Sequence, residues 1–350
     1  MPEDSIQHID FQELNRNAIS QPLVSHIYTA DPSAHVFDGK IYIYPSHDID
    51  TGIPFDDLGS HFAMDDYHVF SMTNPEGPVT DYGAALRLRD IPWAKKQLWA
   101  PDAAYKKGKY YLYFPAKRRD DIFQIGVAVS NSPAGPFKAR PEPIAGSYSI
   151  DPAVFTDEDG AAYMYFGGLW GGQLQSYRNN RYDKTNEEPA PHEPALGPRI
   201  ARLSEDMLEF AESPIELSIL DPQGHPLLAG DNNRRFFEAP WMHKYRGRYY
   251  FSWSTGDTHF ICYAIGDNAY GPFTYAGRIL NPVVGWTTHH SIVEFKAEWW
   301  LFYHDSSLSR GVTHLRSIKA TRLSYDDDGF INTIDPYGPC NVLAAAANKI

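Results

Sequence analysis

The chain of 350 residues alternates apolar and polar positions over many short stretches, a period that is typical of β-strands. The clearest runs are aromatic and β-branched, at 40–44, 110–114 and 299–303, and each follows a tight turn usually built on glycine. Helical periodicity is weak, apart from a short stretch at 10–15. The pattern therefore predicts an all-β fold made of many short strands.

One phrase occurs five times along the chain. A polar or aromatic head residue is followed by small or apolar residues, a turn and a burst of aromatic residues. The five heads are Asp31, Trp99, Asp151, Glu238 and His289. Repeats of this length indicate stacked or radial units, and four short antiparallel strands per unit form a propeller blade. We expect a five-bladed β-propeller with four antiparallel strands in each blade.

The spacing of the heads predicts where the blades begin and where the chain is interrupted. Blades are expected to start near residues 24, 95, 147, 234 and 285, and the two longer intervals indicate insertions near 48–65 and 170–199. A segment near 17–27 or near 330–334 would close the ring, and the sequence does not decide between them. We expect residues 1–350 to form a single domain.

Composition narrows the classes of partner. The net charge is −13 and no run of Lys and Arg exceeds a pair, which argues against nucleic acid and anionic membrane. Two cysteines exclude a disulfide framework and a cysteine-based zinc site. The first twenty residues do not resemble a secretory signal, so we expect a cytoplasmic protein, or a secreted or periplasmic one if a signal was removed. A homo-oligomer is possible, and the sequence does not decide the oligomeric state.

The head positions carry the candidate chemistry. The first strand of each propeller blade lines the central channel, so heads from different blades converge there. Three of the five are carboxylates, which repel one another and are costly to remove from water. A fold retains such a group mainly for acid–base catalysis or for metal binding.

The motifs that open the five repeats resemble glycoside hydrolase family 43. These motifs are Asp-Pro at Asp31, Trp-Ala-Pro-Asp at Trp99, Asp-Pro at Asp151, Glu-Ala-Pro at Glu238 and His-x-Ser at His289. The resemblance covers about residues 20–335 and implies a five-bladed enzyme that acts on xylan- and arabinan-derived sugars. It also implies that the single domain expected over residues 1–350 is catalytic, without the C-terminal β-sandwich that some members of the family carry.

The resemblance also implies roles for individual residues. Asp31 would be the general base, Glu238 the general acid and Asp151 the acid that orients Glu238 and tunes its pKa. Arg316 would reach the sugar and the catalytic centre. His289 would meet a central calcium ion directly or through water, and no organic cofactor is expected.

Further candidates for sugar binding rest on residue type and position. Aromatic rings pack on the apolar faces of sugars, which makes Trp99 a candidate and Trp170, Phe237 and Phe260 weaker ones. His47 and Asp48 follow the second strand of the first blade and would border the pocket. Structural alternatives exist for all of them: Asp-Pro as a turn or cap, His289 as a channel histidine, Arg316 as a surface arginine, and the aromatics as blade packing.

The sequence thus predicts an inverting, exo-acting hydrolase that releases terminal D-xylose from β-1,4-xylo-oligosaccharides. An α-L-arabinofuranosidase, alone or as a dual activity, is the nearest alternative. A sugar-binding propeller without catalysis is the more distant one, because a lectin has no need for three converging acids.

Overall fold

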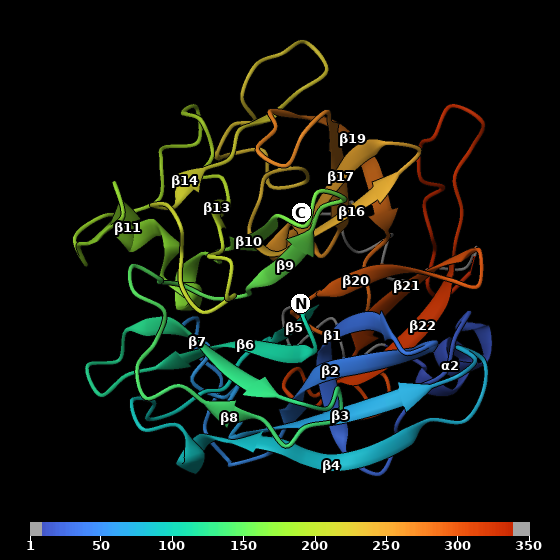
Figure 1. Cartoon of the computed structure of the whole chain (residues 1–350). Helices are drawn as coiled ribbons and strands as arrows, with labels where there is room; N and C mark the ends of the chain where they lie inside the picture. Colours follow the sequence, from blue (N-terminus) through green and yellow to red (C-terminus); the bar gives the residue numbers. More distant parts are fainter. Residues whose placement is uncertain (1–8, 339–350) are drawn as a thin grey trace.

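The computed structural model describes residues 9–338, in which five antiparallel sheets stand around a central axis (Figure 1). Blade 1 contains β1 (Tyr28–Phe37), β2 (Lys40–Asp48), β3 (Asp66–Met72) and β4 (Thr80–Arg87). Blade 2 contains β5 (Asp102–Lys106), β6 (Lys109–Lys117), β7 (Phe123–Ser130) and β8 (Lys138–Ala139). Blade 3 contains β9 (Ala153–Thr156), β10 (Ala162–Phe166), β13 (Arg199–Arg202) and β14 (Ile215–Glu216).

The last two blades depart from four strands. Blade 4 contains β16 (Glu238–Tyr245), β17 (Arg248–Ser254), β18 (Ile261–Gly266) and β19 (Phe273–Leu280), and the short β15 (Ile219–Leu220) pairs in parallel with β19. Blade 5 contains three strands, β20 (His290–Phe295), β21 (Glu298–Asp305) and β22 (Ser317–Leu323). The five-bladed propeller is confirmed, with four strands in three of its blades.

The segments near the two ends of the described chain add to the sheets of blades 5 and 4. The N–H groups of Leu23 and Thr29 donate to the carbonyls of Ile318 and Arg316, at 2.8 and 2.9 Å, so the N-terminal segment lies along β22. It takes the place of a fourth strand in blade 5 and closes the ring. The C-terminal segment instead joins blade 4, where the N–H of Ile334 donates to the carbonyl of Ile279 at 2.8 Å.

The core lies between neighbouring blades. One buried cluster joins blades 1 and 2, another joins blades 4 and 5, and a third, which includes Ile41, Phe70, Phe302 and Ile318, joins blades 5 and 1. The largest cluster spans blades 2, 3 and 4. Alternate residues of each strand face opposite sides, so both sides of a blade are apolar and pack against a neighbour.

The predicted insertions are present and contain little regular structure. Residues 49–65 join β2 to β3, and residues 167–198 join β10 to β13 through two 3₁₀ turns (Trp170–Gly172 and Leu174–Ser176) and the hairpin of β11 (Tyr177–Arg178) and β12 (Arg181–Tyr182). Two further 3₁₀ turns lie at Leu88–Asp90 and Gly256–Thr258. The helix α2 (Phe11–Asn17) falls where a short helical stretch was predicted, and the carboxylate of Asp10 caps it.

No helix among residues 9–338 is both long and apolar enough to cross a membrane.

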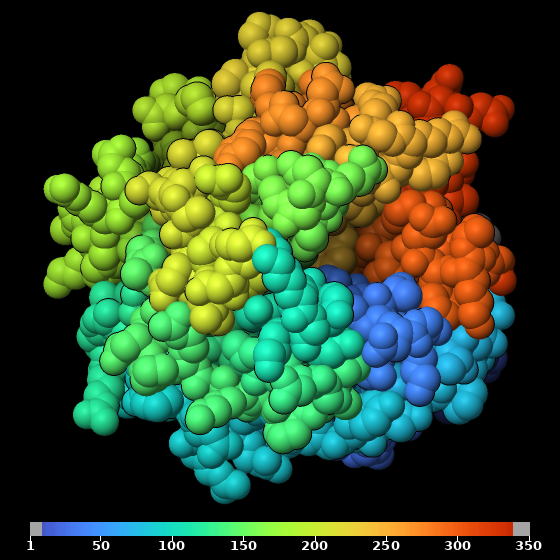
Figure 2. Space-filling model, viewed as in Figure 1, coloured from blue at the N-terminus to red at the C-terminus, as the bar shows by residue number. Residues whose placement is uncertain are grey.

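Figure 2 views the propeller along its axis, on the face where the turns that join the first two strands of blades 1, 2 and 3 surround the centre (blue, teal and green). The head residues stand at the opposite ends of those first strands. The chemistry predicted from the sequence therefore belongs to the far face of the ring.

Candidate active site

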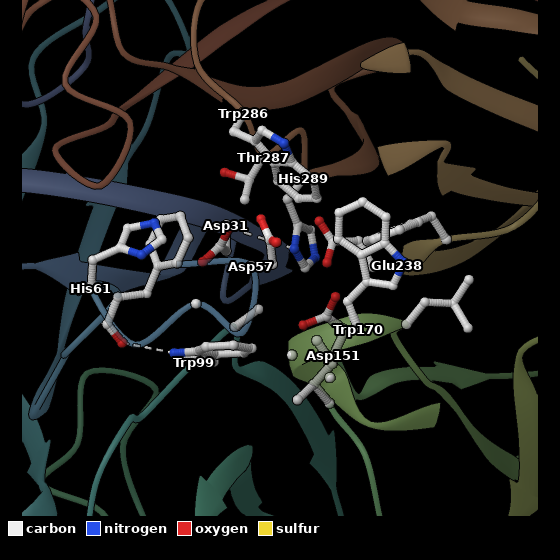
Figure 3. Close-up of a pocket in the computed structure, with 18 of the residues that line it drawn as sticks. Asp31, Asp57, His61, Trp99, Asp151, Trp170, Glu238, Trp286, Thr287 and His289 are labelled. Carbon is white, nitrogen blue, oxygen red and sulfur yellow. Dashed lines mark hydrogen bonds and ion pairs between the residues drawn. The ribbon is translucent and has the colours of Figure 1, made fainter. Parts of the chain in front are cut away.

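All five repeat heads line one pocket at the axis (Figure 3). They enter it from five blades: Asp31, Trp99, Asp151, Glu238 and His289. Arg316, Trp170 and Phe237, which were also predicted from the sequence, line the same pocket. The sequence register therefore predicted how side chains more than 200 positions apart come together.

A local backbone device turns Asp31 toward the axis. The pairing of β1 with β2 shifts between Ala30 and Ser33, and Asp31 lies in this bulge with φ at 51°. Pro32 has no N–H to donate, so the ladder is interrupted there at little cost. Bulges next to active sites re-aim side chains in this way.

The same device recurs at Glu238. The pairing of β16 with β17 shifts between Glu238 and Trp241, and Ala239 has a φ of 59°. Asp151, just before β9, also has a left-handed backbone with φ at 56°. Such a conformation costs a non-glycine residue about 1–3 kcal/mol, so surrounding contacts must hold it. One of them is visible: the N–H of Ala239 donates to Oδ2 of Asp151 at 2.9 Å.

Asp31 is held in its ionised form. Arg316 Nη1 donates to its Oδ1 at 3.1 Å and Ser46 Oγ donates to its Oδ2 at 2.6 Å, while the rings of His304 and His289 lie 3.4 and 3.6 Å from Oδ1. Burial alone would raise the pKa of Asp31. The Arg316 guanidinium, followed by the two imidazoles and the hydroxyl, outweighs burial and lowers the pKa of Asp31 to about 2.

The other two acids are shifted in the opposite direction. Burial, followed by repulsion from Asp31, raises the pKa of Glu238 to about 8, although Arg316 opposes the shift. Burial, Glu238 and Asp31 raise the pKa of Asp151 well above its usual range. At neutral pH the pocket therefore contains an ionised carboxylate together with carboxyl groups that retain protons. Burial and Asp31 account for the raised pKa of Glu238, and tuning of this pKa by Asp151 stays a prediction.

Arg316 donates hydrogen bonds to two buried carboxylates, Asp31 and Asp48. Its Nη2 and Nε donate to Oδ1 and Oδ2 of Asp48 at 2.7 and 2.9 Å, and its Nη1 reaches both Asp31 and Thr287. This two-point grip fixes the plane of the guanidinium. The alternative of an outer-strand surface arginine is excluded, because Arg316 is 3 % exposed.

Two aromatic walls flank the acids. Trp99 is fixed by its indole N–H, which donates to the carbonyl of Phe62 at 2.8 Å. On the other side Trp170, Phe237 and Trp286 pack together, with ring centroids 5.2–5.7 Å apart. Flat apolar faces beside polar groups are the usual lining of a sugar pocket.

Both insertions roof this pocket. Gly59, in the first insertion, lies so close to Trp99 that a Cβ would stand 2.8 Å from the indole ring. Gly171, in the second, would place a Cβ 2.5 Å from the carbonyl oxygen of Leu58. The two loops thus meet each other and Trp99 at distances that only glycine permits.

Three sequence predictions of direct sugar contact are not met, because His47, Asp48 and Phe260 do not line the pocket. His47 pairs with Asp66 on another part of blade 1. The carboxylate of Asp48 forms an ion pair with Arg316 instead of facing the pocket. The ring of Phe260 is buried with the Arg278 guanidinium over it, 3.5 Å from the ring centroid.

The structure adds pocket residues that the sequence analysis missed. Seven of them carry polar or aromatic side chains: Phe55, Asp56, Asp57, His61, Phe62, Trp286 and Thr287. The first five belong to the insertion at 49–65, which has no counterpart in the other repeats. Trp286 and Thr287 lie three and two positions before the head His289, and this short distance in sequence was the available signal.

His289 is the candidate calcium ligand at the axis of the propeller. Calcium prefers six to eight oxygen ligands. Among residues 9–338 no set of three ligand-type side chains comes together at His289. A calcium ion there would rest on one imidazole and a largely aqueous shell.

Glycosidases use a pair of this kind, in which a buried ionised carboxylate shares a pocket with a protonated carboxyl group. The chain belongs to the family described as Glycosyl hydrolases family 43, whose sequence profile matches residues 19–331. The resemblance noted from the repeat heads is therefore confirmed.

Relatives of known name agree with this assignment. Xylosidase/arabinosidase 43A of Humicola insolens is 63% identical over 326 residues, which cover 90% of this chain and 99% of the relative. A beta-xylosidase of Xylanibacter ruminicola is 56% identical over 309 residues, covering 88% of this chain and 97% of its own.

Solved structures agree as well. CoXyl43, a GH43 beta-xylosidase/alpha-arabinofuranosidase from a compost microbial metagenome, was solved with xylotriose in a calcium-free form. It is 67% identical with a TM-score of 0.90 over 91% of this chain and 98% of its own. The GH43_1 enzyme from Xanthomonas citri, complexed with xylotriose, is 62% identical with a TM-score of 0.91 over 95% of this chain and 98% of its own.

Proposed function

We propose that this protein is an inverting, exo-acting β-xylosidase that releases terminal D-xylose from β-1,4-xylo-oligosaccharides. The observation that carries the proposal is the opposite shift of two carboxyl groups in one pocket. The pKa of Asp31 is lowered to about 2 and that of Glu238 is raised to about 8. Near neutral pH the first can only accept a proton and the second can only donate one.

In the proposed reaction Asp31 takes a proton from a water molecule, whose oxygen attacks the anomeric carbon. Glu238 gives its proton to the glycosidic oxygen as the bond from that oxygen to the anomeric carbon breaks. The anomeric configuration inverts because water enters on the face opposite the leaving group. Asp31 ends protonated and Glu238 ionised, and exchange with solvent restores both groups.

Asp151 and Arg316 are proposed as positioning residues. Asp151 supports the backbone beside Glu238 through the N–H of Ala239, and its own burial disfavours a second negative charge. Arg316 keeps Asp31 ionised, and Asp48 holds the guanidinium in place. The aromatic walls would take the apolar faces of the sugar rings.

Exo action is supported by the roof. The two insertions line the pocket and contact each other beside Trp99, and we infer that this contact narrows the entrance to one chain end of the substrate. Terminal xylose is the primary choice because the relatives named above are xylosidases and two of the structures hold xylotriose.

An α-L-arabinofuranosidase activity at the same site is the second candidate. Two of the named relatives carry both activities in their names. Parallel rates on p-nitrophenyl β-D-xyloside and α-L-arabinofuranoside rank the two, and a dominant arabinoside rate would reverse our order. The anomer released first, followed by NMR, tests inversion; a retained anomer contradicts the mechanism.

The acid role of Glu238 has a sharper test. p-Nitrophenol is a good leaving group that needs little protonation, whereas the sugar alcohol of xylobiose needs it. We expect Glu238→Gln to lose roughly 10²–10⁴-fold in kcat on xylobiose and much less on the nitrophenyl xyloside. Asp31→Asn should lose comparably on both. Unchanged hydrolysis of both substrates by Glu238→Gln would overturn the assignment of Glu238 as the acid. Only a wild type that binds xylo-oligosaccharides and hydrolyses none of them would favour the non-catalytic, sugar-binding alternative.

We also propose that calcium, where present, sits beside His289 in a shell made mainly of water. Bound there, the ion would add positive charge near Asp31. The proposed steps use only the side chains described above.

A further inference from the structure

Outside the pocket, three histidines and two aspartates of blade 1 and the segment before it form a chain of close contacts. The strands that carry four of them, β2, β3 and β4, lie side by side in Figure 1. Asp66 and His68 are two positions apart on β3, so their side chains emerge on one face. His47 lies on the neighbouring strand β2, and Asp81 on β4. His26 comes from the segment just before β1. None of the five lines the catalytic pocket.

The central three side chains are close enough to share one ion. Nδ1 of His47 lies 2.6 Å from Oδ1 of Asp66, and the rings of His47 and His68 meet edge-on with centroids 4.9 Å apart. One ligand-type atom from each of the three lies within 4.8 Å of the others. Their side chains are 17, 18 and 16 % exposed, so the group is ordered by its neighbours and still open to solvent.

Asp81 provides the support that metal-binding histidines usually have. Its Oδ1 lies 3.2 Å from Nδ1 of His68, its Oδ2 lies 2.7 Å from Nε2 of His26, and the N–H of Gly83 donates to Oδ1 at 2.7 Å. A carboxylate beside Nδ1 keeps the proton on that nitrogen and leaves the lone pair of Nε2 free. His68 is thereby prepared as a ligand through Nε2.

We propose that His47, Asp66 and His68 form a binding site for a divalent transition-metal ion of the zinc type, with water completing the tetrahedron. Two imidazoles and one carboxylate suit zinc, whereas calcium requires oxygen ligands. The site lies where the insertion 49–65 begins and ends, because β2 ends at Asp48, next to His47, and β3 begins at Asp66. A bound ion would clamp the two ends of that loop together.

Calorimetric titration of the chelator-treated full chain with ZnCl2 and, separately, CaCl2 tests the site. We expect one zinc ion to bind here and calcium to give no binding that depends on these residues. His68→Ala should weaken zinc binding by at least tenfold. Asp81→Asn keeps all three ligands and should weaken it by about 10–100-fold through loss of support. His225→Ala is the matched control: His225 is 76 % exposed beside Asp221, and its loss should change nothing.

Two readouts keep the test decisive. Hydrolysis of nitrophenyl xyloside by metal-free His68→Ala should equal that of the wild type, which verifies folding because His68 is outside the pocket. Crystals soaked in zinc should give an anomalous peak between His47, Asp66 and His68. Zinc affinity that is equal in wild type and His68→Ala, no zinc binding by the wild type, or a peak only at His289 would each overturn the proposal.

Discussion

Replacing the proposed acid should make the folded protein more stable in alkaline solution while removing its activity. The pKa of Glu238 is about 8 in the folded protein, against an ordinary value of 4.5. Between these values the folded state keeps a proton that the unfolded chain has released. Because stability falls with rising pH wherever the folded state binds more protons, Glu238 destabilises the fold progressively across this window.

The magnitude follows from the two pKa values. Each pKa unit corresponds to about 1.4 kcal/mol, and the linkage relation gives a loss of up to about 4 kcal/mol in unfolding free energy between pH 5 and pH 9. Glu238→Gln has no proton to lose and avoids this loss. Asp31 does not disturb the comparison, since its lowered pKa of about 2 confines its contribution to more acidic solution.

The assay is urea unfolding of wild type and Glu238→Gln at pH 5 and pH 9. We expect the variant to gain stability over the wild type as the pH rises, with Asp151 retaining part of the penalty because it is also buried. Glu294→Gln, at an exposed position of β20, is the control and should follow the wild type. A stability difference between Glu238→Gln and wild type that is the same at both pH values would refute the reasoning.

Three other changes have definite expected outcomes. Arg316→Ala should cost about 3–5 kcal/mol in urea unfolding, because it leaves buried carboxylates unpaired, and should move the acid limb of the kcat/KM profile upward as the pKa of Asp31 rises; an unmoved limb would contradict the pairing. Asp151→Ala should lower kcat more than tenfold with KM nearly unchanged, because it frees the N–H of Ala239 beside the acid; steady-state kinetics on xylobiose measure both. Gly171→Ala should raise KM for xylotriose by separating the two roof loops, while the rate on nitrophenyl xyloside stays within about twofold; equal effects on both substrates would count against the roof.

The repeat made the catalytic heads predictable, because residues in one register of a propeller occupy equivalent places around its axis. Asp31, Glu238 and His289 could therefore be assigned to one pocket without knowledge of any contact. The two bulges at Asp31 and Glu238 also left a signal in the sequence, because Pro32 and Pro240 lie within them and a proline cannot donate a ladder hydrogen bond.

Residues outside the register were not predictable in the same way. Asp57 and His61 belong to an insertion that has no repeat partner, so their direction depends on how that loop packs against Trp99. Asp48 was expected to border the sugar pocket and instead forms an ion pair with Arg316. Its position in the sequence indicates that it is near the pocket but does not indicate the direction in which its side chain points. Ring closure was undecided for a related reason: both ends of the chain can pair with an exposed sheet edge.

The seam between the first and last blades also sets when the enzyme becomes active during its synthesis. The hydrogen bonds from Leu23 to Ile318 and from Thr29 to Arg316 join segments from opposite ends of the sequence, and the contact between Arg316 and Asp31 crosses the same seam. A growing chain therefore carries its base long before the group that keeps the base ionised has been translated. Catalysis should begin only when the ring shuts, and heating that opens this seam should end it before the remaining blades unfold.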